Sequence, residues 1–169
     1  DFLMSNLAIQ SNVIRAAHKA NVKRLLFLGS SCIYPKNSPQ PIKEEYLLTS
    51  ELELTNRPYA IAKIAGIEMC WSFNRQFKTQ YLAAMPTNLY GPNDNYDLEN
   101  SHVLPALIKK IHDAKIKSLQ TVEIWGSGDP KREFLHSDDL ASSLLHLINL
   151  SDEAFKEITN PSKAPLINI

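Results

Sequence analysis

A short apolar run near the start of the chain constrains the fold more than any other segment. Residues 25–31 read Leu-Leu-Phe-Leu-Gly-Ser-Ser, a hydrophobic stretch that ends in small polar residues. A run of this length is typical of a strand that is buried on both faces of a parallel sheet. Ligands of open α/β sheets bind beyond the carboxyl ends of such strands. We therefore expect Ser30, Ser31 and Cys32 to lie at a binding edge of the sheet.

A tyrosine and a lysine stand four residues apart at the start of the next periodic segment. Residues 59–77 contain no interior proline, and apolar residues recur at helical spacing at Ile61, Ala65, Cys70 and Phe73. Tyr59 and Lys63 would share one face of this predicted helix. A neighbouring ammonium lowers the pKa of a tyrosine, which brings its phenol closer to the range that general acid–base catalysis requires. The bare pattern more often marks a packed tyrosine beside a solvated lysine, so the catalytic assignment depends on the strand before it.

The rest of the chain alternates predicted helices with predicted strands. Helices are predicted over residues 2–19, 103–115 and 137–150, strands over 81–85 and 121–125, and loops over 35–58 and 86–96. This alternation is typical of an α/β protein with a mostly parallel sheet. We predict a Rossmann-like doubly wound fold. Residues 1–90 would be the C-terminal part of a dinucleotide-binding domain, and residues 91–169 would be segments of a substrate-binding region interleaved with the last Rossmann elements.

Composition argues against several functional classes. Eighteen basic and 18 acidic residues balance to zero net charge, so no electrostatic footprint for nucleic acid or an anionic membrane is present. No apolar stretch approaches the roughly 20 residues that span a bilayer, and no signal-peptide pattern is visible. Two cysteines do not make a disulfide framework, and Cys70 is expected in the core. We expect a cytoplasmic protein with no nucleic-acid, membrane or metal partner.

Five motifs, in order along the chain, resemble those of one enzyme family. They are Gly29-Ser-Ser-Cys-Ile-Tyr-Pro35, Pro58-Tyr-Ala-Ile-Ala-Lys-Ile-Ala-Gly66, Met85-Pro-Thr-Asn-Leu-Tyr-Gly-Pro92, Ser101-His-Val-Leu-Pro105 and Trp125-Gly-Ser-Gly-Asp-Pro-Lys-Arg-Glu-Phe-Leu-His136. The first two resemble the extended short-chain dehydrogenase/reductase superfamily. The whole set resembles the GDP-L-fucose synthase family, also described as GDP-4-keto-6-deoxy-D-mannose 3,5-epimerase/4-reductases.

The resemblance implies a role for each candidate catalytic residue. Tyr59 would protonate the C4 oxygen of the sugar, and Lys63 would lower the pKa of Tyr59 and bond the nicotinamide ribose. Ser30 would bond the same C4 oxygen. Cys32 and His102 would exchange protons at C3 and C5, with the division into base and acid left open. NADPH as the cofactor, rather than NADH, follows from the resemblance alone.

The resemblance also implies the binding residues and a homodimer. Cofactor contacts are implied at Leu28, Gly29, Ser30, Ser31, Tyr59, Lys63, Pro86, Thr87, Asn88, Leu89 and His102. Substrate contacts are implied at Lys110, Trp125 and Arg132. Lys110 departs from the arginine expected in many relatives, which keeps the charge but loses the bidentate fork. Related enzymes commonly dimerise through the helices that match residues 2–19 and 59–77.

Two alternatives and one departure from the family remain. A sugar 4-epimerase or 4,6-dehydratase would share the tyrosine and lysine, but a dehydratase has an acidic pair where this chain has Cys-Ile-Tyr-Pro. A non-catalytic NADP-binding scaffold usually loses the tyrosine or the lysine. None of the five glycines forms the glycine-rich turn that grips a pyrophosphate. Family members carry that turn upstream of the position of Asp1 and continue past Ile169, so we expect a fragment.

Overall fold

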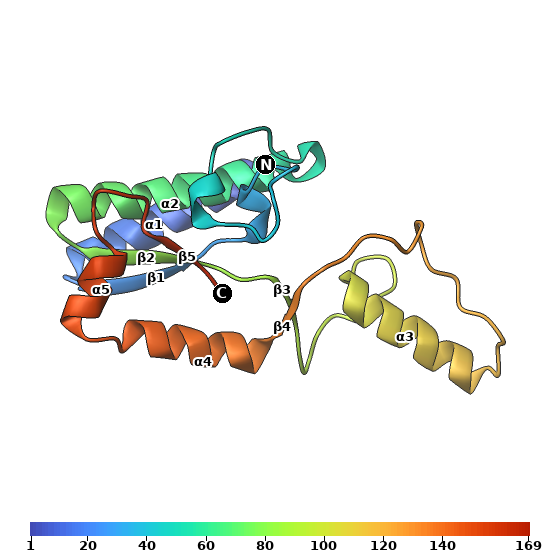
Figure 1. Ribbon diagram of the computed structural model, residues 1–169. Helices are drawn as coiled ribbons and strands as arrows, with labels where there is room; N and C mark the ends of the chain where they lie inside the picture. The colour runs from blue at the N-terminus through green and yellow to red at the C-terminus, as the bar shows by residue number, and fades with distance from the viewer. The chain divides into compact units, whose positions relative to one another are not determined.

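Three parallel strands form the sheet of the first structural unit (Figure 1). The computed structural model describes residues 1–169, and this unit comprises residues 1–87 and 140–169. The strands are β1 (Arg24–Leu28), β2 (Gln80–Met85) and β5 (Leu166–Asn168), in the order β1-β2-β5. Leu26 pairs with Leu82 and Ala83 pairs with Leu166, both in parallel register. The predicted α/β class with a parallel sheet is confirmed.

Helices cover both faces of this sheet. Those on one side are α1 (Phe2–Lys19) and α2 (Arg57–Phe77), and those on the other are α4 (Ser137–Ile148) and α5 (Asp152–Ile158) (Figure 1). Successive side chains of a strand point to opposite faces. Phe27 and Tyr81 accordingly pack under α1 and α2. Leu82 packs against Leu147 of α4 and Phe155 of α5. This two-sided arrangement is the predicted doubly wound fold.

The strand β1 is shorter and more exposed than predicted. It ends at Leu28, and Ser31–Ile33 form a one-turn 3-10 helix, η1. The Ser30 hydroxyl accepts a 3.5 Å hydrogen bond from the backbone N–H of Cys32, which caps η1 as the chain leaves the sheet. Leu28 is 44% exposed, whereas every residue of β2 is buried. The burial on both faces that was predicted for residues 25–31 is found in β2, which lies between two strands. β1 lies at the edge of the sheet and has only one strand neighbour.

The first two helices lie close to their predicted bounds. Residues 2–19 are helical as predicted, and Gln10 Nε2 of α1 donates a 2.7 Å hydrogen bond to the Ala62 carbonyl of α2. Helix α2 begins at Arg57 and holds Pro58 in its first turn, where a missing N–H costs no helical hydrogen bond. The predicted apolar stripe is only partly correct, because Ile61 is 39% exposed. The buried residues of α2, covered by α1 and the sheet, are Ala60, Ala62, Ile64, Gly66, Ile67, Cys70 and Asn74.

Residues 88–139 form the second unit. Its elements are β3 (Asn88–Tyr90), α3 (Val103–Ile116) and β4 (Phe134–His136), and β3 pairs with β4 in parallel. The strand predicted over residues 121–125 does not form, and Ile124 and Trp125 are 54% and 77% exposed. Strands β3, β4 and β5 were not predicted, because three-residue strands carry too little periodicity to be recognised. The seven-residue helix α5 was not predicted either. No helix of the chain is both long and apolar enough to cross a membrane.

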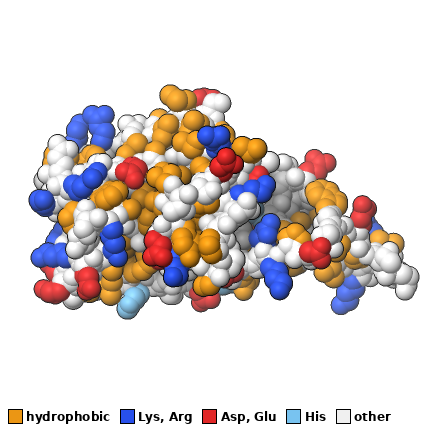
Figure 2. All heavy atoms as spheres, turned by 45° about the horizontal axis from the view of Figure 1, so that its top comes forward, with side chains coloured by type: hydrophobic (Ala, Val, Ile, Leu, Met, Phe, Trp, Pro, Cys, Tyr) orange, Lys and Arg blue, Asp and Glu red, His pale blue; other side chains and the backbone are white.

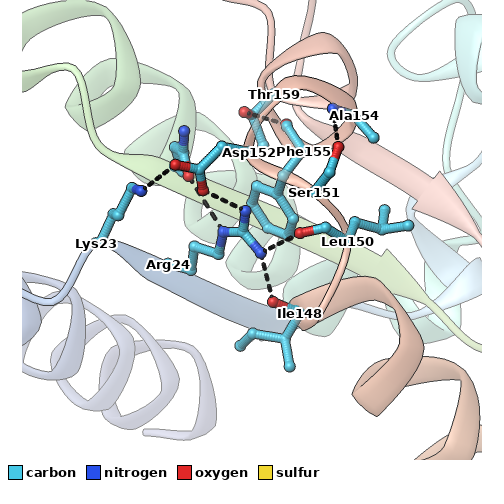
Figure 3. Close-up of polar contacts among 10 residues, drawn as sticks. Lys23, Arg24, Ile148, Leu150, Ser151, Asp152, Ala154, Phe155 and Thr159 are labelled. Atoms are coloured by element: carbon cyan, nitrogen blue, oxygen red, sulfur yellow. Dashed lines mark hydrogen bonds and ion pairs between the residues drawn. The ribbon is translucent and has the colours of Figure 1, made fainter.

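Arg24 joins the start of β1 to the segment between α4 and α5 (Figure 3). Its Nη1 donates hydrogen bonds of 2.6 Å and 2.7 Å to the carbonyls of Ile148 and Leu150. Its Nη2 pairs with Asp152 Oδ1 at 2.8 Å, and its Cζ lies 4.4 Å from the centre of the Phe155 ring. The last carbonyls of a helix have no partner within the helix. Arg24 therefore satisfies the end of α4 and fixes the helical layer on that side of the sheet.

Candidate active site

Four of the five predicted catalytic residues meet just beyond the carboxyl end of β1. Ser30 caps η1 and Cys32 lies within it. Tyr59 and Lys63 lie one turn apart in the first part of α2. Ser30 Oγ accepts a 3.5 Å hydrogen bond from the backbone N–H of Cys32, and the Ser30 hydroxyl lies near enough to Tyr59 and to the Cys32 thiol to lower the pKa of both. Lys63 Nζ lies 5.5 Å from the centre of the Tyr59 ring. The fifth residue, His102, lies in the second unit.

Burial raises the pKa of Tyr59 above the ordinary value of a tyrosine. Cys32 raises it further, and the hydrogen bond with Ser30 opposes the change. Lys63 was predicted to lower this pKa, but the net shift is upward and Lys63 is not among its causes. The Lys63 ammonium lies against the Tyr59 ring and donates a 2.7 Å hydrogen bond to the Leu28 carbonyl. Tyr59 is consequently a phenol at neutral pH and is ready to donate a proton.

Burial also shifts the two other titratable groups of the cluster. It lowers the pKa of Lys63, and Cys32 opposes that change. It raises the pKa of Cys32, against the hydrogen bond with Ser30 and the charge of Lys63. Cys32 is therefore a thiol at neutral pH. Both free cysteines have raised pKa values, and that of Cys70, a fully buried core residue as predicted, reaches about 12.

Two glycines allow close packing around the end of β1, Gly29 against β2 and Gly66 of α2 against β1. A Cβ at Gly29 would lie 2.2 Å from Met85 Cε, and the Gly29 N–H donates a 2.9 Å hydrogen bond to the Ala84 carbonyl. A Cβ at Gly66 would lie 2.2 Å from Cζ of Phe27. Gly66 and Phe27 were not among the residues predicted to form the site. A glycine inside a helical pattern was the available signal, because such a glycine usually marks close packing.

The predicted cofactor residues divide between the two units. Pro86 is buried and Thr87 half-buried directly after β2. The carboxyl ends of parallel neighbours share one sheet edge, so this pair lies at the same edge as Leu28 and Gly29. In the second unit, Asn88 pairs with Phe134 in the β3–β4 ladder, and its Nδ2 donates a 3.1 Å hydrogen bond to the Glu133 carbonyl. Leu89 is 37% exposed, and Ser31 in the first unit is also exposed.

The second unit brings together two of the three predicted substrate residues. Lys110 Nζ lies 4.5 Å from the centre of the Trp125 ring and donates a 3.2 Å hydrogen bond to the Glu123 carbonyl. The ring of Trp125 remains 77% exposed. Arg132 is exposed and bonds the carbonyl of Lys131 rather than either of these residues. His102 is also exposed and immediately precedes α3.

A serine, a tyrosine and a lysine at the carboxyl edge of a doubly wound parallel sheet define a short-chain dehydrogenase/reductase. More narrowly, the chain belongs to the NAD dependent epimerase/dehydratase family, whose family model matches residues 1–160. It is 54% identical over 161 residues to a GDP-L-fucose synthase from Escherichia coli, which covers 95% of this chain and 50% of that protein. It is 57% identical over 149 residues to GDP-L-fucose synthase 1 from Arabidopsis thaliana, covering 88% of this chain and 46% of that protein.

A solved structure of high similarity is a GDP-D-glycero-L-gluco-heptose synthase from Campylobacter jejuni in the presence of NADPH. Its TM-score is 0.87 at 39% sequence identity, and the match covers 100% of this chain and 58% of that one. The chain thus spans about half the length of the curated relatives that it matches.

Proposed function

We propose that the protein acts as an NADPH-dependent GDP-L-fucose synthase. It would invert C3 and C5 of GDP-4-keto-6-deoxy-D-mannose and then reduce C4. The observation that carries the proposal is the cluster of Ser30, Cys32, Tyr59 and Lys63 at one strand end. Tyr59 and Lys63 suit reduction of a ketone, and Cys32 adds a thiol that a simple reductase does not need. Identities of 54% and 57% to GDP-L-fucose synthases support this particular reaction.

The first half of the proposed reaction moves protons at carbon. A ketone at C4 acidifies the protons on C3 and C5. One side chain removes such a proton from one face, and another returns a proton to the opposite face, so the centre inverts with no net gain or loss of atoms. A thiol and an imidazole are suited to this exchange, because as free groups both titrate near neutral pH. We assign the pair to Cys32 and His102.

The second half reduces the ketone to an alcohol. When bound, NADPH supplies the hydride that C4 accepts. Tyr59 donates the proton that the C4 oxygen gains, and its raised pKa keeps that proton in place at neutral pH. Ser30, whose hydroxyl lies near Tyr59, orients the same oxygen. An ammonium has three donors, and the Leu28 carbonyl takes one from Lys63, so the others fit the hydroxyls of a nicotinamide ribose.

The proposed substrate site suits a nucleoside diphosphate. Lys110 provides a positive charge beside the exposed Trp125 ring. Arg132 provides a guanidinium that can bond two phosphate oxygens at once. We assign all three residues to the substrate.

Variants of Tyr59, Cys32 and His102 in full-length protein test the proposal. Tyr59→Phe should lower reduction about 10²–10⁴-fold, the usual contribution of a general acid, while deuterium from D₂O still enters C3 and C5. Cys32→Ser and His102→Gln should lose that deuterium and release an unepimerised 6-deoxy sugar. Mass spectrometry and NMR of the products measure both effects. Normal deuterium uptake in both of the latter variants would leave only a plain sugar-nucleotide reductase.

A second candidate is reduction of a different GDP-4-keto sugar. The 39% identity and TM-score of 0.87 to a GDP-heptose synthase favour it. Offering the protein a GDP-4-keto-heptose and GDP-4-keto-6-deoxy-D-mannose in competition separates the two candidates, because the preferred substrate dominates the product mixture.

We also propose a homodimer formed through α1 and α2. The outer face of α1 exposes Phe2, Ile9 and Val13 at 59%, 65% and 54%. Figure 2 turns the α1–α2 side of the sheet toward the viewer and shows hydrophobic side chains open at the surface among charged ones. Covering such a face removes apolar area from water. Ile9→Asp should shift the mass measured by light scattering from dimer to monomer, and an unchanged mass would move the interface elsewhere.

A further inference from the structure

The ring of Phe27 lies beside the ammonium of the catalytic lysine. Lys63 Nζ is 5.2 Å from the centre of this ring, within the distance at which a cation is attracted to an aromatic face. Phe27 also directly precedes Leu28, whose carbonyl accepts the 2.7 Å hydrogen bond from Lys63. Two consecutive residues of β1 therefore hold the same ammonium, one through its ring and one through its backbone.

A missing side chain on α2 makes room for this ring. Gly66 stands three residues after Lys63, so both lie on the same side of the helix. A Cβ at Gly66 would approach Cζ, Cε1 and Cε2 of Phe27 to 2.2 Å, 2.7 Å and 2.8 Å. The ring thus occupies the space that any other residue at position 66 would fill. A glycine in a helix interior lowers helix stability. Room for the Phe27 ring is therefore obtained at the expense of the stability of α2.

The ring has little freedom to move elsewhere. It packs against both hydrophobic clusters under α1 and α2, one around Ile67 and one around Tyr81. On the neighbouring strand it pairs in register with Ala83, a small residue. The ring is therefore held by sheet and helix together, and a displaced ring would displace the ammonium that rests on it.

We propose that Phe27, seated against Gly66, is a positioning residue that sets the location of the Lys63 ammonium. The proposal rests on the proposed role of Lys63 in reduction. The titratable groups that face Lys63 are Tyr59 on the same helix and Cys32 in η1. Phe27 itself carries no charge and acts through Lys63. Its replacement should therefore alter how Lys63 behaves without removing a reacting group.

Two single variants and their combination test this inference in full-length protein. Phe27→Leu removes the ring and leaves a gap, and Gly66→Ala pushes the ring away. The double variant Phe27→Leu/Gly66→Ala places the new methyl in the vacated space, so its melting temperature should return toward that of the wild type. Phe73→Leu is the matched control, because Phe73 lies on α2 itself and packs in the cluster around Tyr81, and Lys63 rests against other rings.

The first readout needs no cofactor. Lys63 is half-buried, whereas Lys19 is exposed, so acetylation of Lys63 relative to Lys19 reports how well the ammonium is held. Acetic anhydride labelling followed by peptide mass spectrometry should show Lys63 reacting several-fold faster in all three test variants. The control should match the wild type. Wild-type labelling in the folded double variant would overturn the proposal.

The second readout is the pH profile of reduction. The rate falls as pH rises through the pKa of Tyr59 in the loaded enzyme, because the general acid is lost. Bound NADPH and substrate exclude water from the site, which strengthens the attraction between the Lys63 ammonium and a Tyr59 phenolate. Moving the ammonium away therefore raises that pKa. The alkaline limb of the test variants should shift upward by about half a pH unit or more, and kcat should fall about tenfold. An unshifted limb with wild-type kcat in the double variant would refute the inference. Lys63→Met separates a failure of this inference from a failure of the proposed function. Full activity in that variant would contradict the proposed role of Lys63 in reduction.

Discussion

Replacing Arg24 with methionine should destabilise the protein far more than replacing its neighbour Lys23. Methionine keeps an unbranched apolar stem but has no donor. The Arg24 side chain is only 14% exposed, and its loss leaves the carbonyls of Ile148 and Leu150 without the 2.6 Å and 2.7 Å bonds that they accept. Leaving a buried polar group unsatisfied costs about 1–3 kcal/mol. Methionine retains part of the packing on Phe155, so we expect the unfolding free energy to fall by about 2–4 kcal/mol.

The control uses the same carboxylate. Lys23 Nζ pairs with Asp152 at 2.7 Å, but its side chain is 60% exposed. Exposed ion pairs contribute little, because water and salt screen them. Lys23→Met should therefore unfold at nearly the same urea concentration as the wild type. Urea unfolding in full-length protein gives the global effect, and hydrogen exchange of the α5 amides reports whether the loss is local to this contact.

The two variants together test the reasoning. Faster exchange in α5 with Arg24→Met alone would confirm that the guanidinium fixes this layer. Equal destabilisation by both substitutions would show that pairing with Asp152, rather than the carbonyl contacts, supplies the stability. Unchanged exchange in α5 with Arg24→Met would refute the structural role altogether.

The remaining predictions concern pH and a buried amide. The hydrogen bond from Lys23 is the largest influence that lowers the pKa of Asp152, so this pair stabilises the protein above the ordinary Asp pKa of about 4 and the contribution is lost as pH falls below it. The acid slope of stability should be shallower in Lys23→Met and in 1 M NaCl, and an identical slope in wild type and variant would contradict the assignment. Asn74 exchanges 2.8 Å hydrogen bonds with the backbone of Tyr81 in both directions and accepts a 2.9 Å bond from Thr79. Asn74→Ala should therefore lower the unfolding free energy by about 2–4 kcal/mol, and a change below about 0.5 kcal/mol would show that water replaces the amide.

Local pattern was sufficient for the longer elements and for the central pair of the site. An 18-residue helix at residues 2–19 and a fully buried strand at Gln80–Met85 have enough periodicity or apolar length to be read directly. Tyr59 and Lys63 share a helix face because of their spacing alone. Short elements escaped, since β3, β4 and β5 have three residues each. Residues 121–125 were mistaken for a strand, because an alternating pattern does not reveal whether a partner strand exists.

The sequence by itself determined the class of fold, the resemblance to sugar-nucleotide enzymes and the residue types available for catalysis. These depend on the order and spacing of residues along the chain. Only the tertiary structure decided that Ser30 lies near both Tyr59 and Cys32, and that Tyr59 has a raised rather than a lowered pKa. It also decided that Phe27 rests against Gly66 and Lys63. Burial and cross-element contacts set these properties, and both arise when segments far apart in sequence are brought together by the sheet.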